Sequence, residues 1–514
     1  MLCTLAQKKY DMKKVLTVLT IFLSVVVGQN ITASDKQSKN VLLVLVDDLR
    51  PEINSWGNRH IKTPNMDRLA EKGASFTRAY CQYANCAPSR KSFLSGLSPE
   101  STGHKESFNE YDEVMNHTTM PGHFRNNGYF TASIGKVYHR AHDDRDSWDF
   151  YYDVGDPKEP GNFPWESYGL KKNQEIIEKD KRPAIEKEDL PLENYNDFNL
   201  CQVALEQLEA NKDKKFFLTV GFRKPHLPFA APEKYWDLYN QDDIPLSEYP
   251  STPLDGDSIV YRWSELANYA WYSKHYKAAN YRNKRVPVEQ SKELRHGYYA
   301  CVSYIDDLIG KLLSKLEELK IGDNTIVILQ GDHGYHLGDQ QVWGKHTCYD
   351  LSTRVPLVVY DPSNKKKKRM RSEFVELLDI YPTLAELCGL PQPKRYDGKS
   401  FVPLLENSSN RGFDAAFNQY QSFQKDPLIK DLLAYAIHTE DYNYIEWQDP
   451  GNDRKIVQRE LYRVADVRVE QENVASNPDY VGIIQELSQR IEDKFSPYRK
   501  SFETYQELSK QDVR

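Results

Sequence analysis

The chain is poor in cysteine, and the cysteines it has are scattered. Seven cysteines in 514 residues include no CxxC pair, which excludes a disulfide-stapled scaffold and a thiolate zinc site. Beyond the first 30 residues, no apolar run reaches the roughly 20 residues that span a bilayer, so we expect no integral membrane segment in the rest of the chain. Positive charge is not in excess either. The 68 Lys and Arg against 75 Asp and Glu leave a net charge of −7, which argues against nucleic acid as a partner.

The longest apolar segment lies at the start of the chain. Met12-Lys13-Lys14 precedes the apolar stretch Val15–Val27, an arrangement typical of a secretory signal peptide. We therefore expect a signal peptide over residues 1–28, with Met12 as a candidate natural start, and a periplasmic or secreted protein. A buried N-terminal helix is the alternative. Removal of residues 1–28 would move the formal charge from −7 to −10, because four lysines and one aspartate are lost.

The rest of the chain indicates two units, since single cores rarely grow past about 250–300 residues. Short apolar runs alternate with helical patterns, which predicts an α/β fold with a mostly parallel sheet covered on both faces. These runs are Val41–Val46, Phe130–Ile134, Phe216–Phe222, Thr325–Gln330 and Val355–Tyr360. Helices are expected over 64–73, along the apolar stripe 302–319, after Pro382, and around 480–495.

The pattern changes near residue 412 to short strand-like pieces, which predicts a small C-terminal α+β unit. We place the large domain at 36–410 and the smaller one at 411–514. Two segments, 150–195 and 240–290, are rich in Pro, Gly, aromatic and charged residues and are candidate substrate-binding walls. The basic run Lys365–Arg369 is interpreted as a solvated loop.

Charged and imidazole side chains follow four of the predicted strands. In parallel α/β sheets, ligands bind outside the carboxyl ends of the strands, so these side chains are expected to converge on one rim. Each one alone could equally be a turn residue, a helix cap or a satisfied histidine, but the repetition favours a site. The residues are Asp47 and Asp48, then Lys136 and His139, then Lys224 and His226, then Asp332 and His333.

The acids on this rim indicate a metal site. Asp47, Asp48 and Asp332 offer hard oxygen ligands and His333 adds a nitrogen, with no thiolate pair. This donor set suits Ca²⁺ or Mg²⁺ better than structural zinc. A cation held there could polarise an anionic ester.

A further motif places a cysteine at the entrance of a short helix. Cys86-Ala87-Pro88-Ser89-Arg90 combines a helix N-terminus with an arginine one turn on, and both favour an anion. Taken alone, Cys86 could be a thiolate nucleophile or a small buried residue.

These segments together resemble a known family. Cys-x-Pro-Ser-Arg ending at Gly96 resembles the signature of the type I sulfatases, and the likeness extends to Asp47-Asp48, Gly135-Lys136, Asp332-His333-Gly334 and Lys345. Within that family, the segments 40–51, 135–139 and 224–229 look most like the iduronate-2-sulfatase subgroup. The resemblance implies an alkaline-phosphatase-like sulfatase fold, with a large mostly parallel sheet and a smaller C-terminal antiparallel sheet.

The resemblance also implies the chemistry of the site. A formylglycine-generating (sulfatase-maturating) enzyme would oxidise Cys86 to formylglycine, whose hydrate attacks sulfur. Asp47, Asp48, Cys86, Asp332 and His333 would hold the metal, with Ca²⁺ favoured over Mg²⁺.

The remaining roles come from the same resemblance. Arg90 and Lys136 would stabilise the sulfuryl oxygens. His226 and Lys345 would contact the sulfate and protonate the leaving oxygen. His139 would deprotonate the second hydroxyl, so that elimination regenerates the aldehyde.

The expected substrate is a sulfated oligosaccharide or polysaccharide. The first candidate is a 2-O-sulfated uronic acid in a glycosaminoglycan or in an algal polysaccharide such as ulvan. Two alternatives are a phosphodiesterase or phosphonate monoester hydrolase of the same superfamily, and an exported carbohydrate-binding protein without turnover. A binding protein without turnover would be expected to lack some of the site residues, and none of them is missing.

Overall fold

In the computed structural model of this chain, all described residues lie within Lys39–Arg514. The described residues are 39–102, 117–139, 144–153, 168–176, 178–256, 264–270, 272, 285–364, 370–407, 412–422 and 431–512. The expected signal peptide, the basic run 365–369 and the expected domain boundary at 410–411 lie outside these residues. That boundary therefore stays a prediction.

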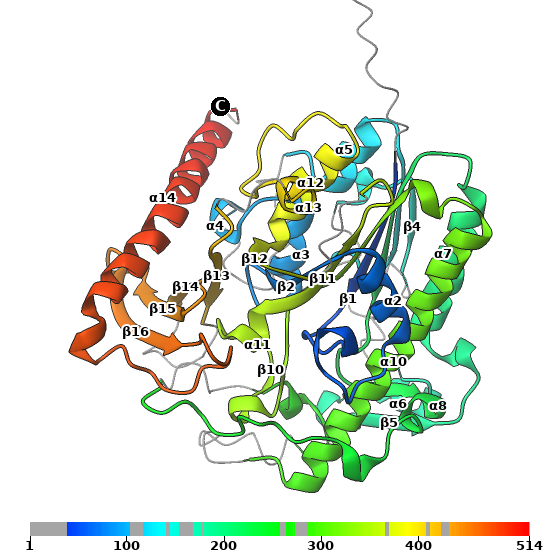
Figure 1. The fold of residues 1–514 in the computed structure, drawn as a ribbon, viewed down its shortest axis with the longest axis horizontal. Helices are drawn as coiled ribbons and strands as arrows, with labels where there is room; N and C mark the ends of the chain where they lie inside the picture. Colours follow the sequence, from blue (N-terminus) through cyan, green and yellow to red (C-terminus); the bar gives the residue numbers. More distant parts are fainter. Residues whose placement is uncertain are drawn as a thin grey trace, which may run out of the picture. The chain divides into compact units, whose positions relative to one another are not determined.

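An eight-stranded sheet forms the centre of the fold (Figure 1). Its strand order is β12-β2-β11-β8-β1-β6-β3-β4. All neighbouring pairs are parallel except the two that involve β11, so the predicted mostly parallel sheet is confirmed. The strands are β1 (Asn40–Val46), β2 (Ala74–Tyr80), β3 (Phe130–Gly135), β4 (Phe150–Tyr152), β6 (Phe216–Phe222), β8 (Thr325–Gly331), β11 (Arg354–Tyr360) and β12 (Met370–Glu376).

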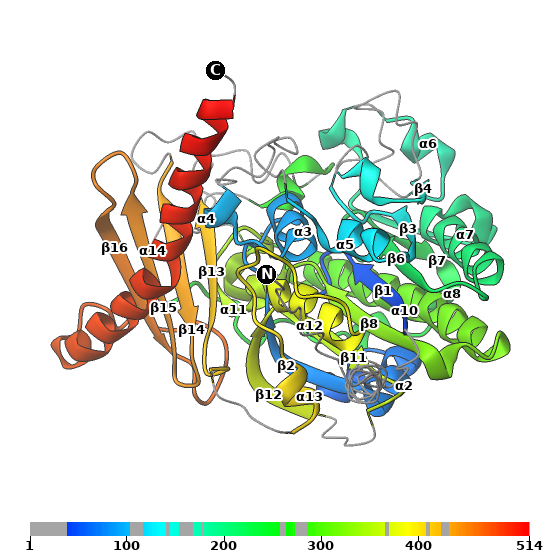
Figure 2. The ribbon, with the colours of Figure 1, turned by 90° about the horizontal axis from the view of Figure 1, so that it is seen from above.

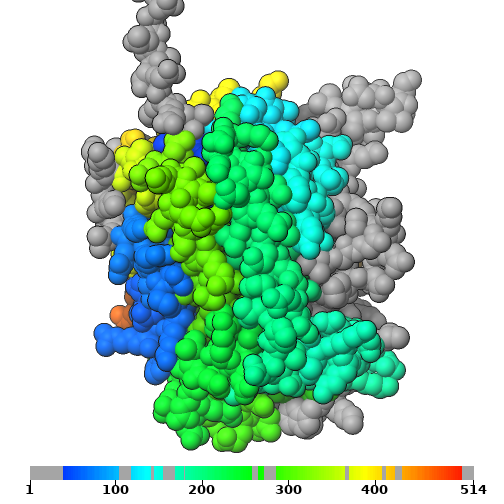
Figure 3. All heavy atoms as spheres, turned by 90° about the vertical axis from the view of Figure 1, so that its right-hand side faces the viewer, coloured from blue at the N-terminus to red at the C-terminus, as the bar shows by residue number. Residues whose placement is uncertain are grey.

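Helices cover both faces of this sheet because its central strands are apolar on both sides. In β1, Leu42, Val44 and Val46 enter one core, whereas Val41, Leu43 and Leu45 enter the other. The first core is closed by α2 (Pro64–Lys72), α7 (Asn196–Ala210) and α10 (Val288–Glu318), which lie side by side on the face seen in Figure 3. The second is closed by α3 (Cys86–Ser95), α5 (Met120–Asn126) and α12 (Ile380–Leu387).

A smaller antiparallel sheet follows in the C-terminal part, as predicted (Figure 2). It has the order β13-β14-β15-β16 and carries the long helix α14 (Val481–Asp512) against one face, where Tyr435 and Ile437 pack with Leu487 and Ile491. Its other face packs against the loops that surround the main sheet, through residues such as Trp447 and Tyr349. The strands are β13 (Ala416–Gln421), β14 (Leu433–His438), β15 (Tyr442–Asp449) and β16 (Lys455–Arg463).

Short elements connect these layers. They are α4 (Pro99–Thr102), α6 (Lys171–Gln174), β5 (Ile185–Glu188), β7 (Phe229–Pro232), α8 (Glu233–Trp236), β9 (His336–Leu337), β10 (Trp343–Gly344), α11 (Asp350–Thr353) and α13 (Val402–Leu405). Six cysteines fall in the described part of the chain, and all six are free thiols. Among the described helices, none combines the length and the hydropathy needed to cross a bilayer.

Candidate active site

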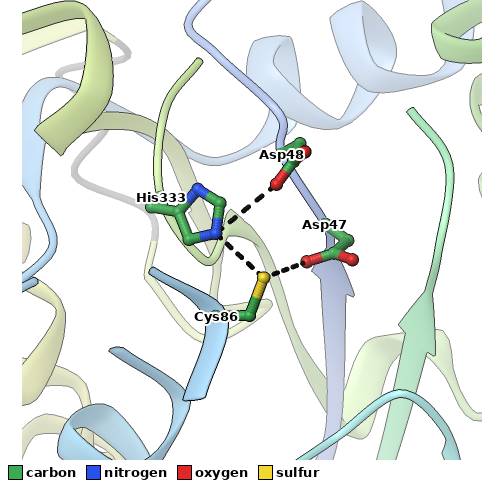
Figure 4. A group of neighbouring side chains, drawn as sticks. All are labelled: Asp47, Asp48, Cys86 and His333. Carbon is green, nitrogen blue, oxygen red and sulfur yellow. Dashed lines mark hydrogen bonds and ion pairs between the residues drawn. The ribbon is translucent and has the colours of Figure 1, made fainter. Parts of the chain in front are cut away.

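The carboxyl ends of β1, β3, β6 and β8 meet at one edge of the main sheet, and the side chains that follow them converge there. Asp47 and Asp48 follow β1, Lys136 follows β3, and Asp332 and His333 follow β8. Figure 4 shows the carboxylate of Asp47 and the ring of His333 directed toward the sulfur of Cys86, and the carboxylate of Asp48 directed toward the same ring. The convergence expected from the sequence is therefore present for these residues. Lys224 differs, because its Nζ donates to the carbonyls of His226 and Pro228 in its own loop.

Asp47 lies between two cations and the cysteine. One carboxylate oxygen is paired with Lys136 Nζ, and the other accepts from Arg90 Nη2 at 3.2 Å and lies 3.4 Å from Cys86 Sγ. Burial acts to raise the pKa of Asp47, but Lys136 and Arg90 outweigh it and lower this pKa well below its usual range. Asp47 is therefore a permanent negative charge at the base of the site.

Asp48 adopts a left-handed backbone conformation, with φ at 59°, which turns its carboxylate toward the site. Its Oδ1 accepts from Lys345 Nζ at 2.7 Å and lies 3.4 Å from His333 Nε2. Its backbone is held from both sides, because its N–H donates to Asp332 Oδ1 at 3.1 Å and its carbonyl accepts from the Tyr298 hydroxyl at 2.9 Å. This strained turn is thus pinned by three separate segments of the chain.

Cys86 is the first residue of α3 and is buried. Its Sγ lies 3.2 Å from His333 Nε2, 3.4 Å from Asp47 Oδ1 and 3.5 Å from Lys345 Nζ. His333 Nδ1 is 3.0 Å from the Gly334 carbonyl, so Nε2 presents a lone pair to the sulfur. Burial, together with Asp47, raises the pKa of the Cys86 thiol to about 12. An unmodified thiol at this position would hardly ionise near neutral pH.

Arg90 ties the cysteine helix to the strand ends. Its Nε donates to Asp332 Oδ2 at 2.9 Å, and its Nη1 donates to the carbonyls of Lys136 and Val137. The Ser89 hydroxyl donates to the carbonyl of Asp332. The guanidinium thus fixes the geometry of three segments as well as supplying charge.

Two predicted histidines border the same site. His226 Nδ1 bonds the carbonyl of Leu227, and its Nε2 lies 3.9 Å from Asp48 Oδ2. His139 is half-buried, and burial together with Lys136 lowers its pKa well below the usual value. Burial together with Lys345 likewise lowers the pKa of His226, so both rings are neutral near pH 7 and each keeps a lone pair on one ring nitrogen.

The donor set fits a hard divalent cation. Ligand atoms of Asp47, Asp48, Cys86 and His333 all lie within 4.8 Å of one another, and Asp48 Oδ2 is a buried oxygen that accepts no hydrogen bond in the described part of the chain. The predicted ligand Asp332 is not in this group. Both its oxygens accept hydrogen bonds, from Arg90 and from the N–H groups of Asp48 and His333, as both oxygens of Asp47 do from Arg90 and Lys136. Carboxylate oxygens of this kind are preferred by Ca²⁺ and Mg²⁺.

One residue of the site was missed by the sequence analysis. Glu265 is buried, and its Oε1 lies 3.1 Å from Lys345 Nζ. It also groups with Asp48 and His226 within 4.8 Å. Glu265 comes from the segment 240–290, which was expected to form a wall of the substrate site. It follows no strand, so a search for side chains at the ends of predicted strands could not identify it.

Family models match most of the chain. The model described as "Sulfatase" matches residues 39–390. A second model, "N-sulphoglucosamine sulphohydrolase, C-terminal", matches residues 338–496 and thus covers the smaller antiparallel sheet.

Individual relatives agree with these matches. Iduronate 2-sulfatase of Mus musculus is 31% identical over 516 residues, covering 87% of this chain and 93% of that protein. A solved structure in complex with its substrate D-glucosamine-2-N,6-O-disulfate has a TM-score of 0.71 and 22% identity, over 90% of this chain and 99% of that one. Phosphonate monoester hydrolase of Agrobacterium radiobacter has a TM-score of 0.73 and 21% identity, over 90% and 96%. At these identities the two structures establish only the shared fold.

Proposed function

This chain belongs to the sulfatase family and is a sulfuric ester hydrolase, and from that premise we propose that it removes sulfate from a carbohydrate. The substrate we propose is a 2-O-sulfated uronic acid or a related sugar in a glycosaminoglycan or an algal polysaccharide. The iduronate 2-sulfatase of Mus musculus, whose name specifies a 2-O-sulfated uronic acid, supports this choice.

The observation that carries the proposal is the environment of Cys86. Its sulfur is buried within 3.5 Å of Asp47, His333 and Lys345, yet burial raises the pKa of its thiol to about 12. A thiolate nucleophile would need the opposite shift. We therefore infer that Cys86 acts after a maturation enzyme has converted it to formylglycine, which supplies an oxygen nucleophile at the same position.

The charges of the site match a singly charged ester. With every group ionised, the carboxylates around Cys86 outnumber the cations by one, with Asp47, Asp48, Asp332 and Glu265 against Arg90, Lys136 and Lys345. Burial raises the pKa of Asp48 well above its usual range, and a bound cation would favour its ionised form. One divalent cation would change the balance to a net positive charge of one. A sulfate monoester carries one negative charge, so the complex would be neutral, which limits the desolvation cost of burying the charges.

We propose that the cation is Ca²⁺, held by Asp47, Asp48, Cys86 and His333, with Asp332 beside them. When bound, it would polarise the sulfuryl oxygens of the ester. The chain's own residues would complete the charge stabilisation. Arg90 contacts the Asp47 oxygen that lies next to Cys86, and Lys136 contacts the other oxygen of the same carboxylate.

We assign the proton transfers to Lys345 and two histidines. Lys345 Nζ is an ammonium donor 3.5 Å from Cys86 Sγ, the nucleophile position, and we assign it the protonation of the leaving oxygen. His226 presents Nε2 to the same region, because its Nδ1 is engaged with a carbonyl. His139, beyond Lys136, is assigned the removal of a proton from the nucleophile in the release step.

We also propose that the protein is exported, to the periplasm or the medium. The basic residues 12–14 followed by the apolar segment 15–27 support this. N-terminal sequencing of the protein recovered from the cell exterior tests it, and recovery of intact protein only from the cytoplasm would contradict it.

The proposed activity is tested by sulfate release from defined substrates. A panel would contain 2-O-sulfated uronic acid disaccharides, N- and 6-O-sulfated glucosamine, ulvan oligosaccharides, a phosphodiester and a phosphonate monoester. We expect turnover of a 2-O-sulfated uronic acid. A phosphonate monoester also carries a single negative charge and would satisfy the same charge balance, so turnover of that ester alone would establish the alternative activity instead.

A further inference from the structure

Glu265 is a buried carboxylate that contacts the proposed proton donor. It begins a short 3-10 helix, Glu265–Asn268, and is only 7% exposed. Its Oε1 lies 3.1 Å from Lys345 Nζ. Burying a carboxylate costs free energy unless the group is paired. The pairing of Glu265 with Lys345 therefore suggests that Glu265 has a function in the site.

The local structure fixes Glu265 against the strand that precedes Lys345. The Ser264 hydroxyl donates to the carbonyl of Trp343 in β10 at 3.0 Å and accepts from the N–H of Leu266 at 3.3 Å. Gly344 has φ at 144°, and a Cβ added there would lie 3.3 Å from Glu265 Cγ. The absence of a side chain at Gly344 therefore allows the close approach, and both partners of the ion pair are held by the same short strand.

Lys345 has three neighbours in the site. Its Nζ lies 2.7 Å from Asp48 Oδ1, 3.1 Å from Glu265 Oε1 and 3.5 Å from Cys86 Sγ. Asp48 is an expected metal ligand, and a cation would share the charge of its carboxylate. Once Asp48 shares its charge with a cation, Glu265 would be the neighbouring carboxylate that still directs its full charge at the ammonium group of Lys345 and so orients it.

We propose that Glu265 is a positioning residue that holds the Lys345 ammonium group in line with the departing oxygen of the ester. This inference rests on the proposed function, in which Lys345 is the general acid. As the formylglycine oxygen at position 86 bonds to sulfur, the bond from sulfur to the departing oxygen breaks. The departing oxygen keeps the electron pair and takes a proton from Lys345 Nζ. Glu265 touches neither atom of that bond, and it acts by fixing the direction of the donated N–H.

The dependence of the rate on the leaving group tests this inference. A sugar alkoxide needs a proton as it leaves, whereas 4-nitrophenolate hardly does. In Glu265→Gln, we expect kcat for a sugar sulfate to fall at least about 10-fold more than kcat for 4-nitrophenyl sulfate, since general acid catalysis contributes about 10²–10⁴-fold. Glu265→Asp, which keeps the charge, is expected to recover part of this selective loss.

Two further variants separate the possible outcomes. Lys345→Met defines the selectivity that results from losing the acid itself, and Asp306→Asn is a matched control. Asp306 is a buried carboxylate that accepts from the N–H of Met66 at 2.7 Å in the helical layer, and its removal is expected to lower stability without any leaving-group selectivity.

The results distinguish this inference from the function on which it rests. A selective loss in Lys345→Met with a uniform loss in Glu265→Gln would overturn the role of Glu265 alone. A uniform loss in Lys345→Met would overturn the assigned role of Lys345, and the role of Glu265 with it. If Glu265→Gln loses the increase in thermal stability caused by Ca²⁺, Glu265 is a metal ligand and the inference is wrong. If Glu265→Gln does not fold, the same comparison in Glu265→Asp decides, and a uniform loss there contradicts the proposal.

Discussion

Arg90 Nε donates to Asp332 Oδ2 across 2.9 Å, and both side chains are completely buried. This bond joins the helix that begins with the candidate nucleophile to the end of β8. Because Arg90 also reaches Asp47 at 3.2 Å, one side chain sets the separation of three elements that the site needs together.

Replacement of Arg90 should therefore cost both stability and turnover. Breaking a buried ion pair leaves an uncompensated carboxylate and typically costs about 3–5 kcal/mol. We expect Arg90→Met to lower the free energy of unfolding in urea by that amount and to abolish sulfate release. The matched control is Arg125→Met, whose ion pair with Asp149 at 2.8 Å is largely exposed and should cost no more than about 1 kcal/mol. Equal effects of the two variants would contradict the account of Arg90.

Removal of divalent cations should destabilise the protein. A ligand that binds only the folded state adds about 2.7 kcal/mol at 100 times its Kd, so Ca²⁺ should raise the Tm of chelator-treated protein. Asp48 Oδ2 is a buried oxygen that accepts no hydrogen bond from the described residues. The variant Asp48→Asn removes the negative charge of this side chain, so the increase in Tm caused by Ca²⁺ should largely disappear. An unchanged increase in this variant would show that the cation binds elsewhere.

The pH dependence of stability should reveal a buried histidine outside the active site. Burial lowers the pKa of His438 to about 3, with Asp350 opposing and Arg468 and Arg354 adding to the shift. In the unfolded chain, a histidine binds its proton near pH 6.5. Between about pH 6.5 and 3, the unfolded state therefore holds more protons, and stability is lost as the pH falls, by up to about 1.4 kcal/mol per pH unit.

The variant His438→Gln tests this dependence in urea unfolding at several pH values. Burial raises the pKa of Glu470 to about 7, so this residue makes stability rise as the pH falls. For this reason, the slope of His438→Gln is compared with the slope of the unsubstituted protein. Below pH 6.5, we expect stability to fall less per unit decrease in pH in His438→Gln than in the unsubstituted protein. Parallel slopes would show that the imidazole is protonated in the folded protein.

Close packing between β3 and β6 should make Gly221 irreplaceable. A Cβ added at Gly221 would lie 2.0 Å from the carbonyl oxygen of Lys136, so Gly221→Ala must separate the backbone that carries Lys136. We expect a loss of about 1–3 kcal/mol, as for other overpacked sites, and a fall in kcat. Gly322→Ala is the control, since a Cβ there meets nothing closer than 3.8 Å. A change of Tm in Gly221→Ala no larger than in the control would contradict this prediction.

The sequence predicted the central strands because these are buried on both faces. The predicted run Val41–Val46 falls inside β1, and Phe216–Phe222 coincides with β6. Strands that contain several polar side chains were missed, such as β12 with Ser372 and Glu373 and β13 with Asn418 and Gln419. The antiparallel direction of β11 could not be predicted, because an apolar run buried on both faces looks the same in either direction.

The site residues that come directly after strands of the main sheet were predictable from the sequence. Asp47, Lys136 and Asp332 come directly after strands, and parallel strands end at a common edge. Glu265 follows no strand and lies in a segment without periodicity, so only the folded chain brings it to Lys345.

The mass of the peptide that contains Cys86, measured in purified active protein, tests the central claim most directly. We predict that this peptide has lost its sulfur and gained an aldehyde oxygen, and that the modified fraction rises in proportion to kcat across preparations. Full sulfatase activity with an unmodified thiol at Cys86 would contradict the account.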